Sequence, residues 1–256
     1  MAQEAPLREF LVQKCDREQQ RHWDLFYKRN TTNFFKDRNW LLREFPELML
    51  QAVPEAKAEQ GEKATASRPV LFELGCGVGN TIFPLRRENP NLFVHACDLS
   101  PRAVEHVKQH EEYDPANVHA FHCNLATDNV LDHVPAGSCH LITAFFVFSA
   151  LSLEQMGTVI DSLAKIMAPG GKVCFRDYAI FDHAMIRFKK GHKLGDRFYM
   201  RQDGTRTYFL RQDEARQLFE SRGFKSDRVG YVRRDTVNVK ESIDVARCFL
   251  QGVFVY

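Results

Sequence analysis

The chain has 256 residues, 44% of them hydrophobic, which is enough apolar material for one sizeable α/β domain with additions. No apolar run approaches the length of a membrane span, and residues 1–6 show neither a signal peptide nor a transit peptide. We therefore expect a cytoplasmic protein, with the nucleus as a second location and no membrane partner. The net charge of +2 alone says little about nucleic acid.

The cysteines and the distribution of charge indicate the redox environment of the protein and the kind of ligand that its surface fits. The seven cysteines form no C-x-x-C pair and several fall in apolar segments, so we expect small buried side chains in a reducing compartment. Neither a structural zinc site nor another metal site is expected. Residues 176–234 carry roughly fifteen Lys and Arg against roughly eight Asp and Glu. Such an excess fits a solvated surface, and it also fits a face that binds phosphate groups.

The first 68 residues divide into two segments of different composition. Residues 7–50 are charged and aromatic, with helical spacing of Trp23, Phe26 and Tyr27, so residues 1–50 are predicted to form a helical extension. Residues 51–68 are rich in Ala, Glu and Lys and almost lack large apolar side chains, which predicts a flexible connector. Residues 69–256 are predicted to form the main domain.

From residue 69 onward, strand segments alternate with helical segments. Strands are predicted at 70–74, 93–97, 118–122, 140–147 and 172–177, and helices at 79–88, 101–110 and 153–167. The turn at 168–171 is predicted to end the third helix and to precede the fifth strand. Asp203-Gly204 predicts an inserted β-hairpin. A helix at 212–222 and strands near 227–233 and 245–255 then complete a seven-stranded, mostly parallel sheet with helices on both faces.

The most informative motif is the glycine loop between the first strand and the first helix of the main domain. Residues 73–80 read E-L-G-C-G-V-G-N. A strand, a glycine loop and a helix in succession let the backbone approach a nucleotide-like cofactor closely. Dinucleotide sites use the spacing G-x-G-x-x-G, whereas here the spacing is G-x-G-x-G and Asn80 takes the place of the third glycine. A nicotinamide oxidoreductase is therefore disfavoured.

Two acidic residues indicate which cofactor binds. Glu73 ends the first strand, where it would repel a phosphate but suits S-adenosylmethionine (SAM), which carries a sulfonium, an ammonium and no phosphate. Asp98 lies roughly 20 residues past the last glycine, at the end of the second strand, where a carboxylate can hold both ribose hydroxyls. A structural glycine turn with an N-cap acid is the alternative interpretation.

With these motifs, residues 69–256 resemble a class I SAM-dependent methyltransferase of Rossmann-like fold. The resemblance implies that SAM lies across the ends of the first, second and fourth strands, and it implies cofactor contacts at Gly75, Gly77, Asp98, Asn124 and Phe145. Asn124 stands where many relatives carry an Asp that accepts from the adenine amino group, and its carbonyl oxygen can still accept. Phe145 fits a pocket wall and an ordinary sheet core equally well.

Three further segments carry a narrower resemblance. They are WDLFYKRN at 23–30 with NFFKDRNWL at 33–41, FRDY at 175–178 with DHAMIRF at 182–188, and YMRQDGTR at 199–206. Together they resemble the eukaryotic tRNA 3-methylcytidine methyltransferases, closest to the branch that acts on serine tRNAs. The resemblance implies SAM as methyl donor, S-adenosylhomocysteine as product, a serine tRNA as substrate and seryl-tRNA synthetase as a candidate partner. It also implies that Trp23 and Tyr27 close over the cofactor, although a helix stripe docked on the sheet would look the same.

The chemistry of such an enzyme predicts a carboxylate beside the base. The N3 atom of cytosine needs no general base, because it has a free lone pair and carries no proton at neutral pH. Aligning this lone pair with the sulfonium methyl can supply roughly 7–11 kcal/mol. A carboxylate can balance the positive charge that develops on the ring, and Asp177, at the end of the fifth strand, is the predicted catalytic residue. A buried acid paired with Arg176 or Arg187 is the structural alternative.

Substrate contacts are predicted at aromatic and basic side chains. The target base must leave its stack and enter a pocket, where Phe34, Phe35 and Tyr178 are predicted to sandwich it at roughly 1–3 kcal/mol per stack. Further contacts to the tRNA, most of them to phosphates, are predicted at Lys36, Arg38, Arg176, Arg187 and Arg206.

Two other functions remain open on the sequence. The first is a SAM-dependent methyltransferase of a protein or small molecule, which would not bind tRNA. The second is a non-catalytic tRNA-binding subunit with the SAM fold, which would bind SAM weakly; Asn124 keeps this alternative open. The modest basicity further suggests that the chain gains tRNA affinity from a partner.

Overall fold

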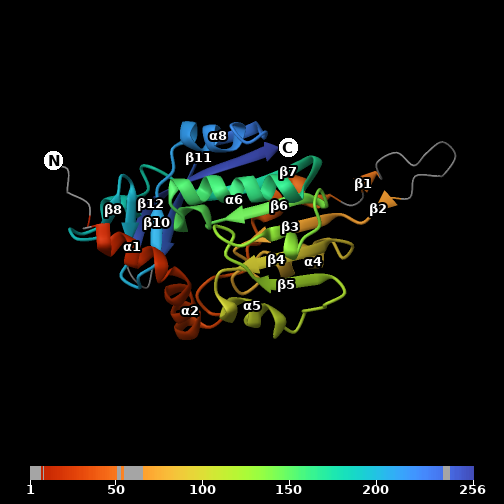
Figure 1. Ribbon diagram of the computed structural model, residues 1–256, viewed down its shortest axis with the longest axis horizontal. Helices are drawn as coiled ribbons and strands as arrows, with labels where there is room; N and C mark the ends of the chain where they lie inside the picture. Colours follow the sequence, from red (N-terminus) through yellow and green to blue (C-terminus); the bar gives the residue numbers. More distant parts are fainter. Residues whose placement is uncertain (1–6, 8, 51–52, 55–65, 239–242) are drawn as a thin grey trace.

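The computed structural model describes residues 7, 9–50, 53–54, 66–238 and 243–256, and its centre is a seven-stranded sheet (Figure 1). The strands are β3 (Val70–Leu74), β4 (Phe93–Asp98), β5 (Val118–His122), β6 (Cys139–Phe145), β7 (Met167–Tyr178), β11 (Lys225–Asn238) and β12 (Ile243–Val255). Their order across the sheet is β11-β12-β7-β6-β3-β4-β5. The strands from β7 to β5 are parallel, while β12 is antiparallel to both neighbours. The predicted mostly parallel, seven-stranded sheet is confirmed.

The strand order creates a crevice at one end of the sheet. The chain starts in the middle at β3, proceeds through β4 to the edge strand β5, and then returns to β6 on the other side of β3. The connections after β3 and β6 therefore leave toward opposite faces of the sheet. In open α/β sheets, ligands bind at this switch point, outside the carboxyl ends of the strands.

Helices cover both faces of the sheet, as predicted. Leu71 and Leu141 belong to the core on the side of α4 (Ile82–Glu88) and α5 (Pro101–Lys108). Phe72 and Ile142, the next residue on each strand, belong to the core on the side of α6 (Leu153–Ile166) and α8 (Gln212–Glu220). Successive side chains of a strand point to opposite faces, so strands that are apolar throughout can fill two cores.

Several element boundaries differ from the prediction, and two of these differences concern glycine-rich segments. The helix predicted from residue 79 begins at Ile82, because Gly75, Gly77 and Gly79 all have positive φ and extend the loop. The fifth strand begins at Met167 and not at residue 172. The Pro-Gly-Gly segment is held in this strand because Met167 pairs with β6 and the Gly170 amide donates to the Tyr256 carbonyl oxygen.

Additional elements surround the carboxyl ends of the strands. The N-terminal segment forms α1 (Glu9–Arg17), α2 (Gln19–Asn30), α3 (Leu41–Glu44) and the 3-10 turn η1 (Pro46–Met49). The predicted hairpin is confirmed as β9 (Phe198–Met200) paired with β10 (Arg206–Tyr208), and β8 (Lys193–Gly195) joins it. The remaining short elements are η2 (Val130–Asp132), η3 (Phe148–Ala150) and α7 (His183–Ile186).

The predicted connector at 51–68 is only partly described. Within it, β1 (Val53–Pro54) pairs with β2 (Ala66–Ser67) in antiparallel fashion. Residues 51–52 and 55–65 lie outside the described residues. The boundaries of the extension, the connector and the main domain stay predictions.

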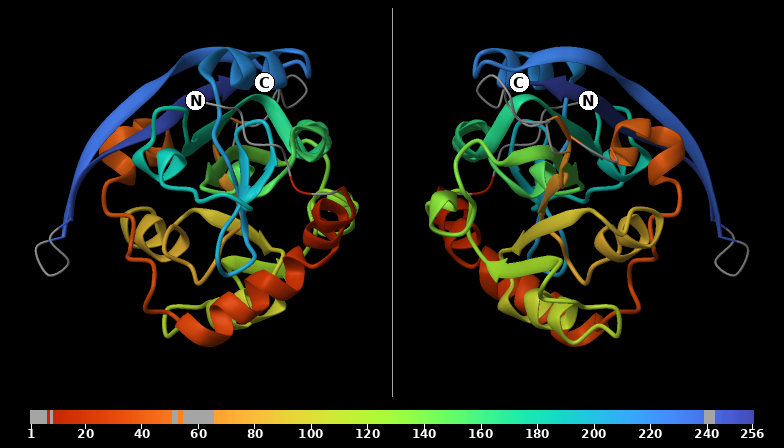
Figure 2. Two further views of the ribbon diagram at one scale, coloured as in Figure 1. Left: turned by 90° about the vertical axis from the view of Figure 1, so that its left-hand side faces the viewer. Right: turned by 90° about the vertical axis from the view of Figure 1, so that its right-hand side faces the viewer.

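β11 and β12 form a long arm that leaves the main sheet. β12 pairs with β7 only over residues 249–255, whereas its pairing with β11 continues to Ile243 (Figure 2). Near its base the arm is tied to the N-terminal segment by the ion pair of Arg228 with Glu47, and farther along by that of Arg234 with Glu44. The arm therefore extends the surface at the end of β7.

Two further properties of the described residues concern membrane-spanning helices and groups that could bind a metal ion. No helix among them is long and apolar enough to cross a membrane. No group of three or more His, Cys, Asp or Glu in the described part of the chain could hold a metal ion. All seven cysteines are buried and free.

Candidate active site

A pocket lies at the carboxyl ends of β3, β4, β5 and β6. Five residues predicted to bind the cofactor contribute to its wall, namely Trp23, Tyr27, Gly75, Asp98 and Asn124. The other three, Glu73, Gly77 and Phe145, are not part of the wall. The wall also contains residues from α1, α6 and β10 that sequence reasoning did not assign to the cofactor.

The glycine loop contributes Leu74 and Gly75 to the pocket wall, and Gly77 lies beside it. Gly75 has φ 61°, and a Cβ atom built there would lie 2.4 Å from Val147 Cγ2. Gly77 has φ 54°, its amide donates to Asp98 Oδ2 at 2.9 Å, and a Cβ atom would meet the Tyr27 hydroxyl at 3.0 Å. Side chains at these positions would be strained and would fill the space above the loop, so glycine keeps the backbone open to a ligand.

Asp98 faces the pocket in a fixed orientation. Its Oδ1 accepts from the Ser100 amide at 2.8 Å, and Ser100 caps α5 by accepting from the Ala103 amide. Burial raises the pKa of Asp98 to about 6, although the Ser100 and Gly77 amides act in the opposite direction. The remaining lone pairs of this carboxylate are free to accept from a ligand, and the contact with ribose hydroxyls stays a prediction.

Asn124 follows β5 on the neighbouring side of the pocket. Its Oδ1 accepts from the Ala126 backbone amide at 3.2 Å, while the backbone amide of Asn124 donates to Asp128 Oδ2 at 2.8 Å. One lone pair of Oδ1 is left over, which is enough to accept one bond from an adenine amino group. The Asn124 side-chain NH2 makes no hydrogen bond to the described residues, so it can also donate to a ring nitrogen.

The helices α1 and α2 form a lid over the pocket. The Trp23 and Tyr27 rings stack with centroids 6.2 Å apart, and Phe26 packs edge-on against both. Asp24 fixes this end of the lid to the start of α5, because its Oδ1 accepts from the Ser100 hydroxyl at 3.0 Å.

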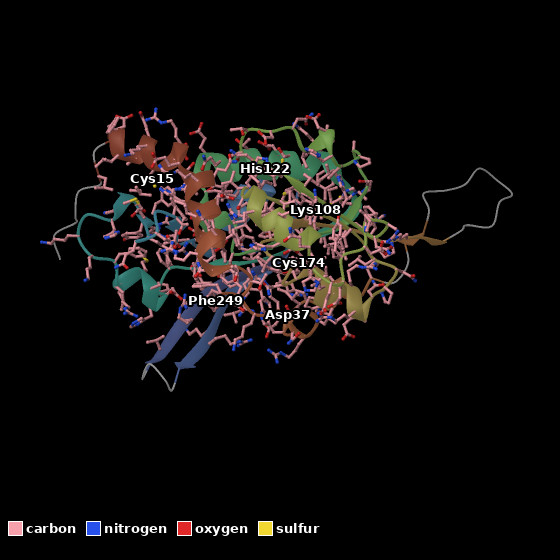
Figure 3. All side chains as sticks on the ribbon, turned by 90° about the horizontal axis from the view of Figure 1, so that it is seen from below. Cys15, Asp37, Lys108, His122, Cys174 and Phe249 are labelled. Atoms are coloured by element: carbon pink, nitrogen blue, oxygen red, sulfur yellow. The ribbon has the colours of Figure 1, made fainter. Side chains whose placement is uncertain are left out.

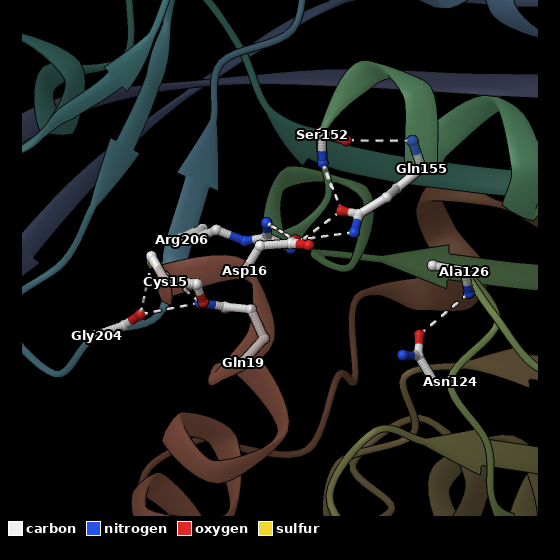
Figure 4. A network of polar contacts seen from close by, with 9 residues as sticks. All are labelled: Cys15, Asp16, Gln19, Asn124, Ala126, Ser152, Gln155, Gly204 and Arg206. Atoms are coloured by element: carbon white, nitrogen blue, oxygen red, sulfur yellow. Dashed lines mark hydrogen bonds and ion pairs between the residues drawn. The ribbon is translucent and has the colours of Figure 1, made fainter. Parts of the chain in front are cut away.

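A polar network fastens the other end of the lid (Figure 4). Asp16 Oδ1 accepts from the Arg206 guanidinium of β10 and from Gln155 Nε2 of α6, the latter at 2.9 Å. Arg206 also donates to Gln155 Oε1 at 3.1 Å. Gln19 Nε2 reaches the hairpin tip by donating to the Gly204 carbonyl oxygen at 3.1 Å. Elements far apart in the chain thus form one continuous pocket wall.

The wall suits SAM in its chemistry. An acid stands where ribose hydroxyls would lie, and the glycine loop leaves the backbone accessible. Two buried wall residues each keep one polar atom without a partner, Gln19 Oε1 and Arg206 Nε. Unpaired buried polar atoms are costly, so a polar ligand is expected here. Sequence reasoning missed Asp16, Gln19 and Gln155, because these residues come together only through tertiary contacts.

The two phenylalanines at the end of β6, Phe145 and Phe146, lie in different environments. Phe145 is buried in the core, with its ring centroid 5.2 Å from that of Phe45 and 5.7 Å from that of Trp40. Phe146 has φ 62°, uncommon for a residue with a side chain, and lines the pocket. Adjacent residues at a strand end point in opposite directions, so the sequence allowed only one of the two phenylalanines to face a ligand.

Glu73 lies beneath the glycine loop, outside the pocket wall. Its carboxylate accepts from the Thr143 hydroxyl, and burial raises its pKa to about 7, while Arg38 opposes this shift. Glu73 therefore carries only part of its charge at neutral pH. Its contact with the cofactor stays a prediction.

Asp177 is enclosed at the end of β7. The residue is 0% exposed, Oδ2 accepts from the Ser149 amide at 2.9 Å and Oδ1 from the Tyr178 amide at 2.8 Å. Burial raises its pKa to about 6. Neither Arg176 nor Arg187 pairs with this carboxylate. Asp177 thus holds the start of η3 and the residue that follows it, directly under the candidate substrate site.

Above Asp177 lies a cluster of aromatic rings and cations. The Phe146 ring centroid is 5.3 Å from that of Tyr178 and 5.4 Å from that of Phe249, which lies where the long arm joins the sheet (Figure 3). Arg201 and Arg247 lie over the Tyr178 ring at 5.4 and 5.5 Å. Such a cluster offers π-faces and positive charge together, the combination that unstacked nucleotides require.

The other predicted substrate residues fall into three environments. Phe34 is 59% exposed and packs with Phe35 and Phe26 on top of the lid. Lys36 and Arg187 are exposed. The guanidinium groups of the others are enclosed: Arg206 lies in the pocket wall, Arg38 lies over Phe146, and Arg176 lies 4.4 Å from the Trp40 ring, where burial lowers its pKa to about 10.

Comparisons with known proteins agree with this geometry. Residues 72–173 match the family model of the methyltransferase domain. The chain is 48% identical to human "tRNA N(3)-cytidine methyltransferase METTL6" over 247 residues, which is 96% of this chain and 84% of the relative. It is 42% identical to the "tRNA(Thr) (cytosine(32)-N(3))-methyltransferase" of Saccharomyces cerevisiae over 254 residues, which is 97% of this chain and 39% of the relative.

The fold is also shared with solved structures. A SAM-dependent methyltransferase from Anabaena variabilis superposes with a TM-score of 0.62 at 13% sequence identity, covering 99% of this chain and 97% of that one. At this identity the similarity concerns the fold. It confirms the Rossmann-like methyltransferase architecture predicted from the sequence.

Proposed function

This chain belongs to the family of tRNA N(3)-cytidine methyltransferases, and from this premise we propose that it methylates the N3 atom of an anticodon-loop cytidine in serine tRNA. Identity of 48% over 96% of the chain is the observation that carries the proposal. The pocket supports it, because acid, glycine loop and lid are arranged for SAM. The tRNA(Thr) enzyme among the relatives makes threonine tRNA the substrate to compare.

The reaction requires that the N3 lone pair be aligned with the methyl group and that the positive charge on the product be balanced. No proton needs to be removed from N3. SAM supplies an electrophilic methyl group when it is bound. The protein must hold the cytosine ring so that the N3 lone pair points at that methyl, exclude water, and tolerate the cationic product. The cluster of Phe146, Tyr178 and Phe249 offers rings against which an extruded base can stack.

Asp177 contributes from beneath this cluster. It is fully enclosed, so it acts through its charge and through the two backbone amides that it holds. The charge favours a positive ring nearby, and the hydrogen bonds fix Tyr178 and η3 in position. In this geometry Asp177 is a positioning residue with an electrostatic role, and Tyr178 is the residue in its neighbourhood best placed to touch the base.

The exposed residues suggest how the rest of the tRNA is held. Lys36 and Arg187 lie on the surface and remain proposed phosphate contacts. Net charge is only +2, so phosphate neutralisation by this chain alone is limited. We propose that seryl-tRNA synthetase supplies the missing affinity by presenting its bound tRNA.

The proposal is tested by incubation with labelled SAM and total tRNA, followed by nucleoside analysis. We expect 3-methylcytidine in serine tRNA, with a higher yield when seryl-tRNA synthetase is added. Appearance in threonine tRNA alone would contradict the serine assignment. Label in protein or small molecules without any 3-methylcytidine would favour a different acceptor, and absence of SAM binding would favour the non-catalytic subunit.

Replacing Tyr178 with alanine should weaken substrate handling without disturbing the cofactor. Loss of one base stack costs roughly 1–3 kcal/mol, so kcat/KM for tRNA should fall roughly 5- to 150-fold. S-adenosylhomocysteine binding, measured by calorimetry, should stay within about twofold of the wild type. Tyr256→Ala is the matched control, because Tyr256 is exposed and its ring packs against Phe224, away from the cluster. Equal losses in both variants would exclude stacking on Tyr178.

A further inference from the structure

We propose that Arg38 binds the α-carboxylate of SAM and thereby selects cofactors that carry an intact amino-acid tail. The sequence suggested a tRNA phosphate as the partner of this residue. The surroundings of its guanidinium point to an anion inside the protein instead. The inference rests on SAM being the cofactor, which the family membership supports, and not on which tRNA is modified.

The first observation is a guanidinium without an anionic partner. The Arg38 side chain forms neither an ion pair nor a hydrogen bond with the described residues; it contacts the faces of Phe145 and Phe146, at 5.8 and 5.2 Å. Burial lowers its pKa, and the field of Glu73 opposes that shift. Arg38 is half-buried, and its guanidinium offers five donors that are costly to leave unpaired away from water. A ligand is therefore expected to complete this site.

The second observation is the position of Arg38 relative to the cofactor pocket. Its backbone amide donates to the Asn80 carbonyl oxygen at 3.0 Å, so the residue is anchored to the end of the glycine loop. Phe146, which its guanidinium covers, lines the pocket. Tyr27 of the lid is close enough to affect its pKa, as are Tyr178 and Asp177. Arg38 thus lies where the cofactor pocket approaches the candidate base site.

The nearby carboxylates do not satisfy Arg38, because both already have partners. Glu73 accepts from the Thr143 hydroxyl beneath the loop. Asp177 accepts from two backbone amides. Both have raised pKa values, about 7 and about 6, so each holds its negative charge weakly. The anion that Arg38 requires must come from outside the chain.

The surroundings of Arg38 favour a carboxylate over a backbone phosphate. A phosphate within a polynucleotide carries chain on both sides and has to stay at the surface, whereas a half-buried guanidinium over the Phe145 and Phe146 rings suits the end of a narrow chain. The amino-acid tail of SAM ends in a carboxylate, and the planar fork of an arginine matches a carboxylate in a bidentate manner. One charged hydrogen-bonded contact of this kind is worth roughly 1.5–3 kcal/mol.

The test compares three ligands by calorimetry on the full chain without tRNA. S-adenosylhomocysteine carries the carboxylate and the ammonium, decarboxylated S-adenosylhomocysteine lacks only the carboxylate, and 5′-methylthioadenosine lacks the whole amino-acid tail. Arg38→Met should weaken S-adenosylhomocysteine binding roughly 10- to 100-fold while leaving the affinities for the other two ligands unchanged. Arg38→Lys should be intermediate, because it keeps the charge but loses the fork.

Controls separate this site from the alternatives. Arg43→Met, an exposed arginine on α3, should behave as the wild type with all three ligands. An equal loss for all three ligands in Arg38→Met would mean that Arg38 only maintains the fold. Unchanged S-adenosylhomocysteine binding together with weaker tRNA binding in a filter assay would restore the phosphate contact and overturn the proposal. None of these readouts depends on 3-methylcytidine formation.

Discussion

Replacing Asp177 with asparagine is expected to lower the rate of 3-methylcytidine formation roughly 100- to 1,000-fold, the effect of removing a preorganised electrostatic contact. The negative charge beneath the base is lost. In addition, the new side-chain NH2 must face either the Ser149 or the Tyr178 amide, since the two carboxylate oxygens of Asp177 accept one bond from each. Single-turnover rates with saturating SAM and tRNA measure the effect.

The pH dependence of the same reaction gives a second readout. The pKa of Asp177 is raised to about 6, so its carboxylate is charged above that pH and becomes neutral below it. The wild-type rate should therefore rise as the pH increases through about 6, and this rise should be absent in Asp177→Asn. Asp98 has a raised pKa of about 6 as well, so the measurement requires saturating SAM. Loss of S-adenosylhomocysteine binding in the variant would assign Asp177 to the fold alone.

Replacing Gly75 with alanine is expected to abolish measurable cofactor binding, with a loss of more than about 100-fold. The new Cβ would lie 2.4 Å from Val147 Cγ2 in the pocket wall, so the loop or the wall must move. Left-handed backbone conformation adds roughly 1–2 kcal/mol of strain. Binding of S-adenosylhomocysteine by calorimetry, together with the melting temperature, measures both contributions.

Gly137→Ala is the matched control for this experiment. Gly137 has φ 63°, almost the same as the 61° of Gly75, but a Cβ atom there meets nothing within 4 Å. Both variants carry the backbone strain, and only Gly75→Ala should lose the cofactor. If the two variants lose affinity equally, the close approach of loop and wall has no role in binding.

The sequence predicted the fold well because local patterns determine it. Apolar runs of strand length alternate with helical segments, and this pattern alone indicates a parallel sheet with two covered faces. Gly75 and Asp98 both line the pocket because the ends of neighbouring parallel strands meet at one edge of the sheet, whereas their contacts to the cofactor stay predictions. Strand ends were less certain, since the pairing of Met167 with Cys139 depends on a neighbouring strand.

Side-chain roles that depend on tertiary contacts could not be predicted from spacing. Arg206 has the sequence context of a surface arginine, yet it is 5% exposed because α1 packs over it and supplies Asp16. Phe145 and Phe146 are adjacent residues of the same type, so the sequence does not show which ring faces the pocket. In the structure it is Phe146, whose backbone has a positive φ. The burial of Asp177 could not be predicted either, because its hydrogen bond from the Ser149 amide depends on the fold.

The lid over the cofactor pocket is continuous in the chain with the segment that is proposed to contact the tRNA. Asp16 and Gln19 hold α1 and α2 against α6 and the β9–β10 hairpin, and the chain continues from α2 directly into Phe34 and Phe35. A chain that lacked the first 50 residues would lose the lid side chains Asp16, Gln19, Trp23 and Tyr27 from the pocket wall. Loss of the lid is therefore expected to weaken SAM binding and to remove, at the same time, the segment proposed to receive the base.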